Sequence, residues 1–352
     1  MSDPSRTPQE VHRETAQAPP RSHAEIDESV TSRQEMSGWQ SALRTQPFWV
    51  FIAIIAIGIV MSLVSDVFLT ERNFFNITRN FAFFGIMALG MSAVICTAGI
   101  DLSVGSLMGL SGIVTGLVMQ AGFGIVPGFL ACMATAAAVG LINGILIAYL
   151  RMAPFVVTLG MLAIARSIAM VVSNNKMVYQ FGPDQDLFER IGGESVFGVP
   201  NPVWVMLFLT LVFWWVWRYS TWGRWVIAIG GNAHAAKLAG IPVERITVSV
   251  YVVCSLCAGL AAFLMVGWFG SVTNGLGQTY ELNVIAASVI GGANLMGGVV
   301  YAFGAPIGAA LMELIRNSLL LAGIDALWQQ FFVGLFLILA VLLEQIRNRG
   351  GR

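Results

Sequence analysis

The chain has 352 residues, of which 57% are hydrophobic and 11% charged, and its mean hydropathy is +0.76. Soluble domains carry about 25% charged residues, so this composition excludes a soluble globular protein and predicts an all-α polytopic membrane protein in a lipid bilayer. The formal net charge is zero, which gives no indication of nucleic-acid binding.

The chain begins with a polar stretch, 1–46, rich in Ser, Pro, Gln, Glu and Arg. Such a stretch cannot bury enough apolar surface to fold alone, so we expect a disordered tail. Apolar runs of about the 20 residues that a bilayer requires then follow one another, some of them broken into shorter pieces. They lie at 47–69, 76–97, 102–120, 124–150, 154–172, 202–217, 246–269, 282–290, 299–321 and 327–343. We expect about ten transmembrane helices in one membrane domain over 47–346, followed by a tail over 347–352.

Two polar loops predict the orientation of these spans. The loop at about 219–245 is basic, whereas the loop at about 173–201 is acidic. Basic residues concentrate on the cytoplasmic side of membrane proteins. With ten spans, Arg151, the basic loop and the Arg-rich C-terminus share one side. Both termini are therefore expected in the cytoplasm, and the acidic loop outside.

Asp101 lies between two long apolar runs with no hydrophilic loop around it. A lone Asp at mid-bilayer costs roughly 2.5–3.5 kcal/mol, and such residues usually face a bundle interior or a water-filled path. Gly99 and Gly105 would let a helix break and restart, and Asp101 or Ser103 would cap the restarted half-helix. Two interpretations stay open, a transport pathway or a helix cap, and one residue can serve both.

A second break occurs at 291–298, where Asn294 follows two glycines and an alanine. Asp101 and Asn294 both follow an apolar run and a glycine and precede a leucine. This pattern indicates a weak internal repeat, of the kind that places a transport path between two halves of a transporter. Asn143 is a further polar residue inside the fourth span.

The motifs of common enzymes are missing from the sequence. Its two lysines lie outside any P-loop pattern, and its three histidines are scattered. All four cysteines lie inside apolar runs and are expected to be small packing residues. We therefore expect no catalytic residue, no cofactor and no metal site, and any ATP hydrolysis must come from another chain. A stand-alone secondary carrier or channel remains open on composition alone.

The basic loop contains an Ala-rich stretch that predicts a short helix. Asn232 is suited to cap its start, Gly240 to end it and Pro242 to stop it. The candidate docking helix comprises Asn232, Ala233, His234, Ala235, Ala236, Lys237, Leu238, Ala239 and Gly240. Docking into a groove of a cytoplasmic partner and lying against lipid headgroups are both compatible with this pattern.

From about 47 to 349 the chain resembles the inner-membrane permease subunits of bacterial ABC importers of the ribose/xylose/arabinose type. The segment 97–112 is similar to the family's T-x-G-I-D-L-S-V-G-S segment, although Ala98 stands where the family often has Gly. The stretches 140–144 and 154–160 resemble its N-G and P-F-x-x-T-L-G runs, and 223–241 resembles its cytoplasmic coupling loop. The glycine-rich stretch 291–298 matches its C-terminal pattern, with Asn294 in place of a common Ser or Thr.

This resemblance implies an importer of a monosaccharide or related polyol in the inner membrane. The implied partners are a periplasmic sugar-binding protein, a cytoplasmic protein with two fused ATP-binding cassettes, and a second permease copy forming a homodimer. On the same basis, the residues expected to line or shape the transport pathway are Gly99, Asp101, Ser103, Gly105, Asn143 and Asn294, and the ATPase-coupling helix is 232–240.

Overall fold

Long apolar helices make up most of the computed structural model, which describes residues 45–325, 328, 331–332, 334–335 and 338. Six of these helices are long and apolar enough to cross a membrane, which confirms the predicted all-α polytopic fold. They are α4 (Gln46–Val64), α5 (Glu71–Cys96), α7 (Ile125–Ala148), α8 (Pro154–Val172), α10 (Asn201–Tyr219) and α13 (Val243–Phe269). The predicted tails and most of the predicted last span, 327–343, lie outside the described residues.

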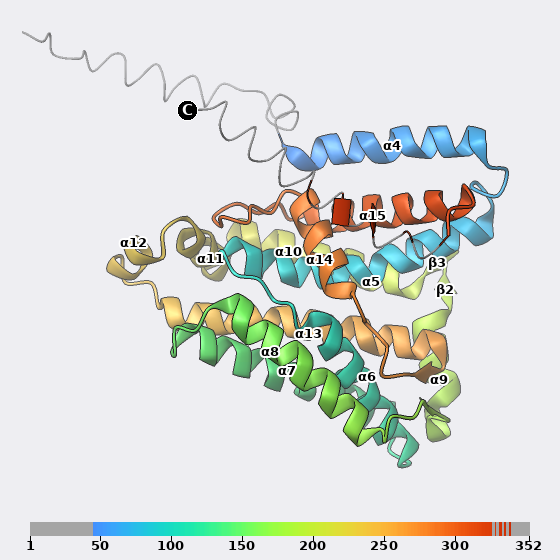
Figure 1. Cartoon of the computed structure of the whole chain (residues 1–352), viewed down its shortest axis with the longest axis horizontal. Coiled ribbons are helices and arrows are strands. Elements are labelled where there is room, and N and C mark those ends of the chain that lie inside the picture. The colour runs from blue at the N-terminus through green and yellow to red at the C-terminus, as the bar shows by residue number, and fades with distance from the viewer. Residues whose placement is uncertain (1–44, 326–327, 329–330, 333, 336–337, 339–352) are drawn as a thin grey trace, which may run out of the picture. The chain divides into compact units, whose positions relative to one another are not determined.

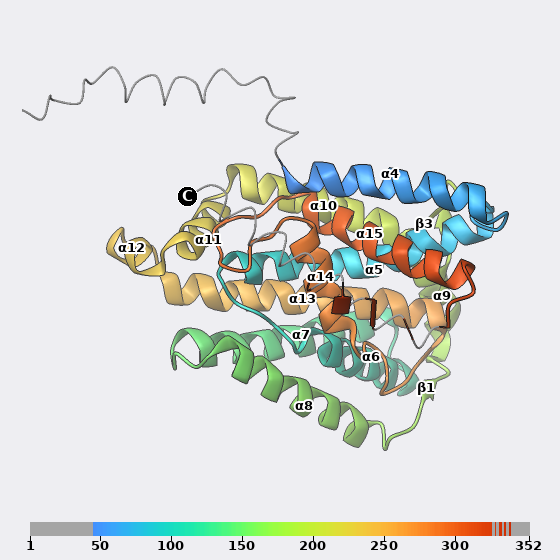
Figure 2. The same cartoon turned by 45° about the horizontal axis from the view of Figure 1, so that its top comes forward.

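Helices α5 and α13 form the centre of the unit that begins at Gln46 (Figures 1 and 2). In the most apolar 18-residue stretch of α5 and of α13, 83% and 78% of the residues are buried, whereas the share is 17–28% in the other four long helices. Small residues allow this arrangement, since a Cβ added at Gly90 of α5 would lie 2.8 Å from Cys254 Cα of α13. The two backbones therefore pack closely, as small residues permit between membrane helices.

Two shorter apolar helices, α6 (Val104–Gln120) and α14 (Tyr280–Ile290), each follow a non-helical segment. The segments are 97–103, after α5, and 270–279, after α13. The next helices, α7 and α15 (Gly304–Leu321), pack in a matching way, because α7 lies along α13 and α15 lies along α5. The structure therefore relates 97–103 to 270–279, and not to the Asn294 break that the sequence pattern suggested.

One end of the bundle carries a small cap of secondary structure between α8 and α10. It contains the strand β1 (Val178–Tyr179), the 3₁₀ turn η1 (Gly182–Asp184), helix α9 (Gln185–Gly193) and the hairpin β2 (Ser195–Val196) and β3 (Val199–Pro200). Strand β1 pairs antiparallel with β4 (Ser271–Val272), which begins the second broken segment. The predicted polar loop 173–201 is thus an ordered cap joined to that segment.

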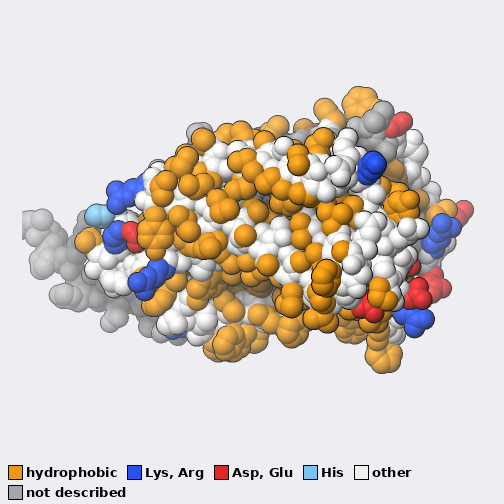
Figure 3. Space-filling model, turned by 90° about the horizontal axis from the view of Figure 1, so that it is seen from below, with side chains coloured by type: hydrophobic (Ala, Val, Ile, Leu, Met, Phe, Trp, Pro, Cys, Tyr) orange, Lys and Arg blue, Asp and Glu red, His pale blue; other side chains and the backbone are white. Residues whose placement is uncertain are grey.

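The opposite end carries α11 (Thr221–Gly231) and α12 (Ala233–Leu238), which occupy the predicted basic loop. Charged side chains gather at both ends of the bundle, and hydrophobic side chains cover the surface between them (Figure 3). Exposed apolar residues such as Phe208 on α10 and Leu130 on α7 belong to this apolar belt. This distribution fits a protein whose middle faces lipid tails.

Candidate functional site

The break between α5 and α6 encloses a buried polar cluster. Asp101 is 0% exposed, and its Oδ1 accepts hydrogen bonds from the backbone N–H of Ser103 (2.8 Å) and from Ser103 Oγ (2.6 Å). The Asn143 amide, on α7, donates to Ser103 Oγ over 3.0 Å. The structure thus joins three of the predicted site residues, Asp101, Ser103 and Asn143, in one hydrogen-bonded chain.

Several polar atoms near this chain have no hydrogen-bond partner among the described residues. They are Asp101 Oδ2, Asn143 Oδ1, the Tyr251 hydroxyl and Ser255 Oγ. Tyr251 closes the cluster from α13, since a Cβ added at Gly99 would lie 2.6 Å from its hydroxyl oxygen. A buried polar atom left without a partner costs about 1–3 kcal/mol. The cluster therefore lowers stability, which is typical of polar residues kept for a function inside a membrane.

The backbone at the break differs in detail from the prediction. The residue with left-handed backbone is Ala98, with a φ of 57°, and not Gly99 or Gly105. Gly105 is required by close packing instead, because a Cβ there would collide with the carbonyl of Gly277 and the carboxylate of Glu281. Ser103 occupies the N-cap position of α6 without a side-chain capping bond. Asp101 stabilises the turn before α6 instead, because its Oδ1 accepts a hydrogen bond from the Ser103 N–H.

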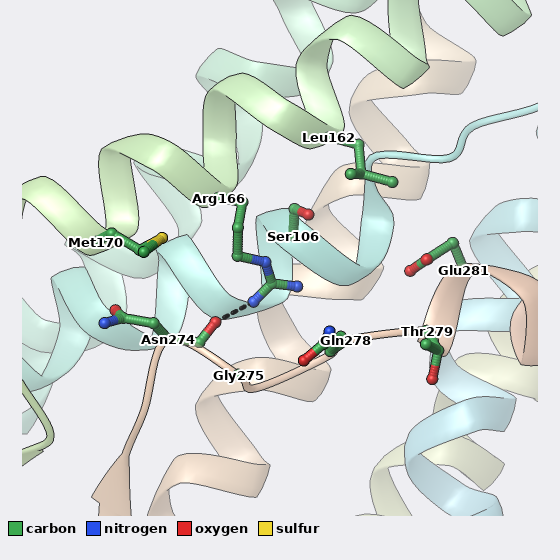
Figure 4. Close-up of a pocket in the computed structure, with 9 residues that line it drawn as sticks. All are labelled: Ser106, Leu162, Arg166, Met170, Asn274, Gly275, Gln278, Thr279 and Glu281. Carbon is green, nitrogen blue, oxygen red and sulfur yellow. Dashed lines mark hydrogen bonds between the residues drawn. The ribbon is translucent and has the colours of Figure 1, made fainter. Parts of the chain in front are cut away.

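A polar pocket of about 500 Å³ lies beside this break, between α6, α8 and the segment that leads into α14 (Figure 4). Its lining consists of Ser106, Leu162, Arg166, Met170, Asn274, Gly275, Gln278, Thr279 and Glu281. None of the six predicted pathway residues belongs to this lining. Asp101, Ser103 and Asn143 are fully buried, so their part in transport stays a prediction.

Arg166 connects the two walls of the pocket. Its Nη1 donates hydrogen bonds to the carbonyl oxygens of Asn274 and of Leu276, the latter over 2.9 Å. Ser173, at the end of α8, also donates to Asn274 Oδ1 over 2.9 Å. Gly109 of α6 permits the approach, since a Cβ there would lie 2.9 Å from Arg166 Nη1. Helix α8 therefore holds the second broken segment in place against α6.

Asn294 lies in a different environment from Asp101. Its Oδ1 accepts the N–H of Met296 over 2.7 Å and so stabilises its own turn. The same turn docks on the end of α5, where the Gly298 N–H donates to the Cys96 carbonyl over 2.9 Å. A Cβ at Gly230 of α11 would collide with this carbonyl and with the Gly298 nitrogen. The Asn294 turn, α5 and α11 thus meet backbone to backbone.

Helix α12 agrees with the predicted short helix in the basic loop. Asn232 Oδ1 accepts the N–H of Ala235 over 2.9 Å as a side-chain N-cap, and Gly240 has a φ of 83° just beyond the helix. Lys237 pairs with Glu244 at the start of α13. Leu238 is 78% exposed. The helix therefore presents an apolar side chain at the end of the bundle.

The residues predicted from the sequence did not include Arg166, Gln278 or Glu281 of this pocket. A signal was present, because ionisable residues inside membrane segments mark functional sites by default. Another buried carboxylate, that of Glu313, pairs with Arg316 three residues further along α15. The four cysteines are buried and unbridged, as expected. In the part of the chain that the structure describes, no group of His, Cys, Asp and Glu residues fits a metal ion.

Comparison with known proteins gives several relatives over most of the chain. The ribose import permease protein RbsC of Escherichia coli is 37% identical over 294 residues, which cover 83% of this chain and 92% of that protein. The L-arabinose ABC transporter permease protein AraH of Azospirillum brasilense is 32% identical over 338 residues, covering 96% and 98%. The D-allose transport system permease protein AlsC of Escherichia coli is 34% identical over 303 residues, covering 85% and 91%.

The family model described as the permease component of branched-chain amino acid transport systems matches residues 73–341. No solved structure matches the chain. The matched range contains both broken segments, the polar pocket and the α11–α12 end of the bundle. The chain therefore belongs to this family of transport-system permease components, and it is similar to the ribose, L-arabinose and D-allose permeases over most of their length.

Proposed function

We propose that this chain is the membrane-spanning permease of an ATP-driven importer that brings a monosaccharide or related polyol into the cytoplasm. The observation that carries the proposal is the 32–37% identity to ribose and L-arabinose permeases over nearly their whole length. The polar pocket at the broken segments supports it, because transporters place substrate paths at discontinuous helices.

The proposed orientation places α12 in the cytoplasm and α9 on the periplasmic side of the inner membrane. Arg151, Arg224 and Arg245 lie at or near the α12 end of the bundle, which agrees with the positive-inside rule. Helix α9 carries Asp186 and Glu189 at the other end. Both termini are then cytoplasmic, as predicted from the loop charges.

In this proposal a periplasmic sugar-binding protein delivers the substrate, and a cytoplasmic tandem ATP-binding cassette protein supplies the energy. Two permease copies face each other across the path. The charged and polar side chains of the pocket support this pairing, since Arg166 and Glu281 in contact with lipid tails would be costly. Asp101, Ser103 and Asn143 shape the path by fixing the α5–α6 break, and Gly99 and Gly105 let its backbone pack closely. Asn294 stabilises the turn that packs against the end of α5.

Helix α12 is the proposed contact with the ATPase. Its apolar end residue Leu238 is 78% exposed at the cytoplasmic end, where a groove on a partner protein would cover it. Burying a leucine side chain completely contributes about 1.5–3 kcal/mol, which changes the affinity of a complex by one to two orders of magnitude. The assignment predicts that the ATPase is lost when this one side chain is made polar.

The test is co-purification of the tagged chain from its native host in mild detergent, followed by mass spectrometry. We expect a tandem-cassette ATPase to accompany the unmutated chain and the control Phe197→Ser, which changes a 93% exposed residue at the opposite end. We expect Leu238→Ser to insert into the membrane normally and to lose the ATPase. An unmutated chain that purifies alone and transports without ATP would instead favour a stand-alone carrier.

A further inference from the structure

The polar pocket lies deep within the thickness of the bundle. Arg166 is twelve residues beyond Pro154, the first residue of α8, which places it roughly 18 Å along that helix. Ser106 belongs to the first turn of α6 and Glu281 to the first turn of α14. Both of these helices begin partway through the bundle, after the broken segments. A solute crossing at the breaks would therefore meet these three side chains inside the membrane.

Two opposite charges face this pocket without contacting each other. Figure 4 shows the Arg166 guanidinium and the Glu281 carboxylate directed into the same space, with Ser106 behind them. None of the ion pairs found among the described residues joins Arg166 to Glu281. Both charges therefore face the pocket without forming an ion pair with each other.

In the part of the chain that the structure describes, only one nitrogen of the Arg166 guanidinium, Nη1, holds the group in place. Its Nη1 donates to the Asn274 and Leu276 carbonyls, which fixes the planar group on the second broken segment. An arginine has five N–H donors, so the rest of the fork is directed at the pocket. The Glu281 carboxylate lies over Gly105, where any side chain would collide with it. Gly105 therefore clears the space that the carboxylate occupies.

We propose that Arg166 and Glu281 form a hydrogen-bonding pair that contacts the hydroxyl groups of a neutral monosaccharide on its way through the path. The inference rests on the proposed function and names the residues that meet the substrate. The guanidinium donates to sugar oxygens, and the carboxylate accepts from sugar hydroxyls. One positive and one negative charge leave the pair neutral, which suits an uncharged polyol better than an ion of either sign.

The rest of the lining indicates a contact made for passage rather than for retention. The pocket volume of about 500 Å³ lies in the range of about 300–1,000 Å³ for small-molecule sites. Small-molecule sites are usually rich in aromatic and other apolar side chains. Here the apolar side chains are Leu162 and Met170, and the nine lining residues include no aromatic one. We therefore expect polar contacts that orient the sugar, with no aromatic face in the lining on which the sugar would stack.

The test uses the full chain reconstituted in liposomes with its cassette ATPase and its binding protein. Uptake is measured for D-ribose, L-arabinose and D-allose, and then for the monodeoxy analogues of the best of these sugars. Glu281→Gln and Arg166→Gln are compared with Glu71→Gln and Arg72→Gln, which remove the same charges at exposed positions outside the pocket. The same binding protein is used throughout. Its own sugar preference therefore cancels when the uptake of each sugar by a variant is divided by the uptake of that sugar by the unmutated chain.

We expect Glu281→Gln to lower uptake of the best sugar about tenfold, the effect of losing a hydrogen bond to a charged group. The loss should largely disappear for the one deoxy analogue that lacks the hydroxyl bound by Glu281. Arg166→Gln should show the same behaviour with a different analogue. The two control variants should transport every sugar like the unmutated chain.

Equal losses for the parent sugar and all analogues would overturn the inference, because Arg166 and Glu281 would then only support the fold. So would unchanged uptake in both variants. Should Arg166→Gln fail to fold, Glu281→Gln and Arg166→Lys decide the matter. An unmutated chain whose sugar uptake needs no ATP overturns the proposed function and this inference with it. ATP-driven uptake that both variants lower equally for the parent sugar and all analogues overturns this inference alone.

Discussion

Two residues, Ala98 and Asp101, shape the break between α5 and α6 by different means. Ala98 adopts a left-handed backbone, with a φ of 57°, which costs an alanine about 1–2 kcal/mol. Asp101 then accepts two hydrogen bonds from Ser103 within a fully buried turn. The two hydrogen bonds that Asp101 accepts hold the turn that contains this strained residue.

Substitution of Asp101 separates its hydrogen bonds from its charge. Asp101→Ala leaves the Ser103 N–H buried without an acceptor, which should cost about 1–3 kcal/mol and lower uptake per inserted molecule. Asp101→Asn retains an amide oxygen at the same place and should preserve the thermal midpoint in detergent. Thermal unfolding and uptake per molecule in the membrane are measured for both variants. An Asn variant as inactive as the Ala variant but fully stable would show that the carboxylate charge itself acts in the pathway.

At the scale of elements, the contact of α11 with the end of α5 links the α12 end of the bundle to the first broken segment, 97–103. Gly230 touches the Cys96 carbonyl, and Cys96 is the last residue of α5 before the break. The Gly298 N–H donates to the same carbonyl from the turn between α14 and α15. A displacement of α11 and α12 would thus reach both α6 and α14 through one backbone junction.

Adjacent glycines of α11 provide a matched test of this junction. A Cβ at Gly230 would overlap the Cys96 carbonyl, whereas a Cβ at Gly231 meets nothing within 4 Å. Gly230→Ala should therefore cost about 1–3 kcal/mol by overpacking and lower the number of sugar molecules moved per ATP. Gly231→Ala should behave like the unmutated chain. Transport and ATP hydrolysis are measured in the same liposomes.

If both glycine variants move the same number of sugar molecules per ATP, the contact at Gly230 does not couple ATP hydrolysis to transport. A Gly230→Ala protein with reduced stability and an unchanged ratio would show that the contact serves the fold alone. The comparison is sharp because both substitutions add the same methyl group one residue apart on the same helix.

At the scale of the whole molecule, the apolar runs predicted the helices within a few residues. The run 154–172 coincides with α8, and the break at Asp101 lies between α5 and α6. Length and hydropathy decide such spans locally, so no tertiary knowledge was needed. The Asn232 cap and the Gly240 stop of α12 were predictable for the same reason.

The pocket could not be predicted in this way. Arg166 and the carbonyls that it binds are 108 and 110 residues apart in the chain, and the glycine-rich stretch 270–279 has the composition of a plain connection. Its equivalence to the Asp101 break follows only from how α13, α14 and α15 pack. The Asn294 pattern resembled the Asp101 break in sequence. Its turn nevertheless packs against the end of α5, and Asn294 accepts a hydrogen bond from Met296 within the same turn.

The most direct measurement of the central claim is the ATP dependence of sugar uptake by the full chain. The chain is reconstituted with its co-purified ATPase and binding protein in liposomes, with ATP or a non-hydrolysable analogue at the ATPase side. We predict sugar accumulation above the external concentration with ATP, and none with the analogue or without the binding protein. Equal uptake with ATP and with the analogue would contradict it and identify the chain as a carrier or channel that works without an ATPase.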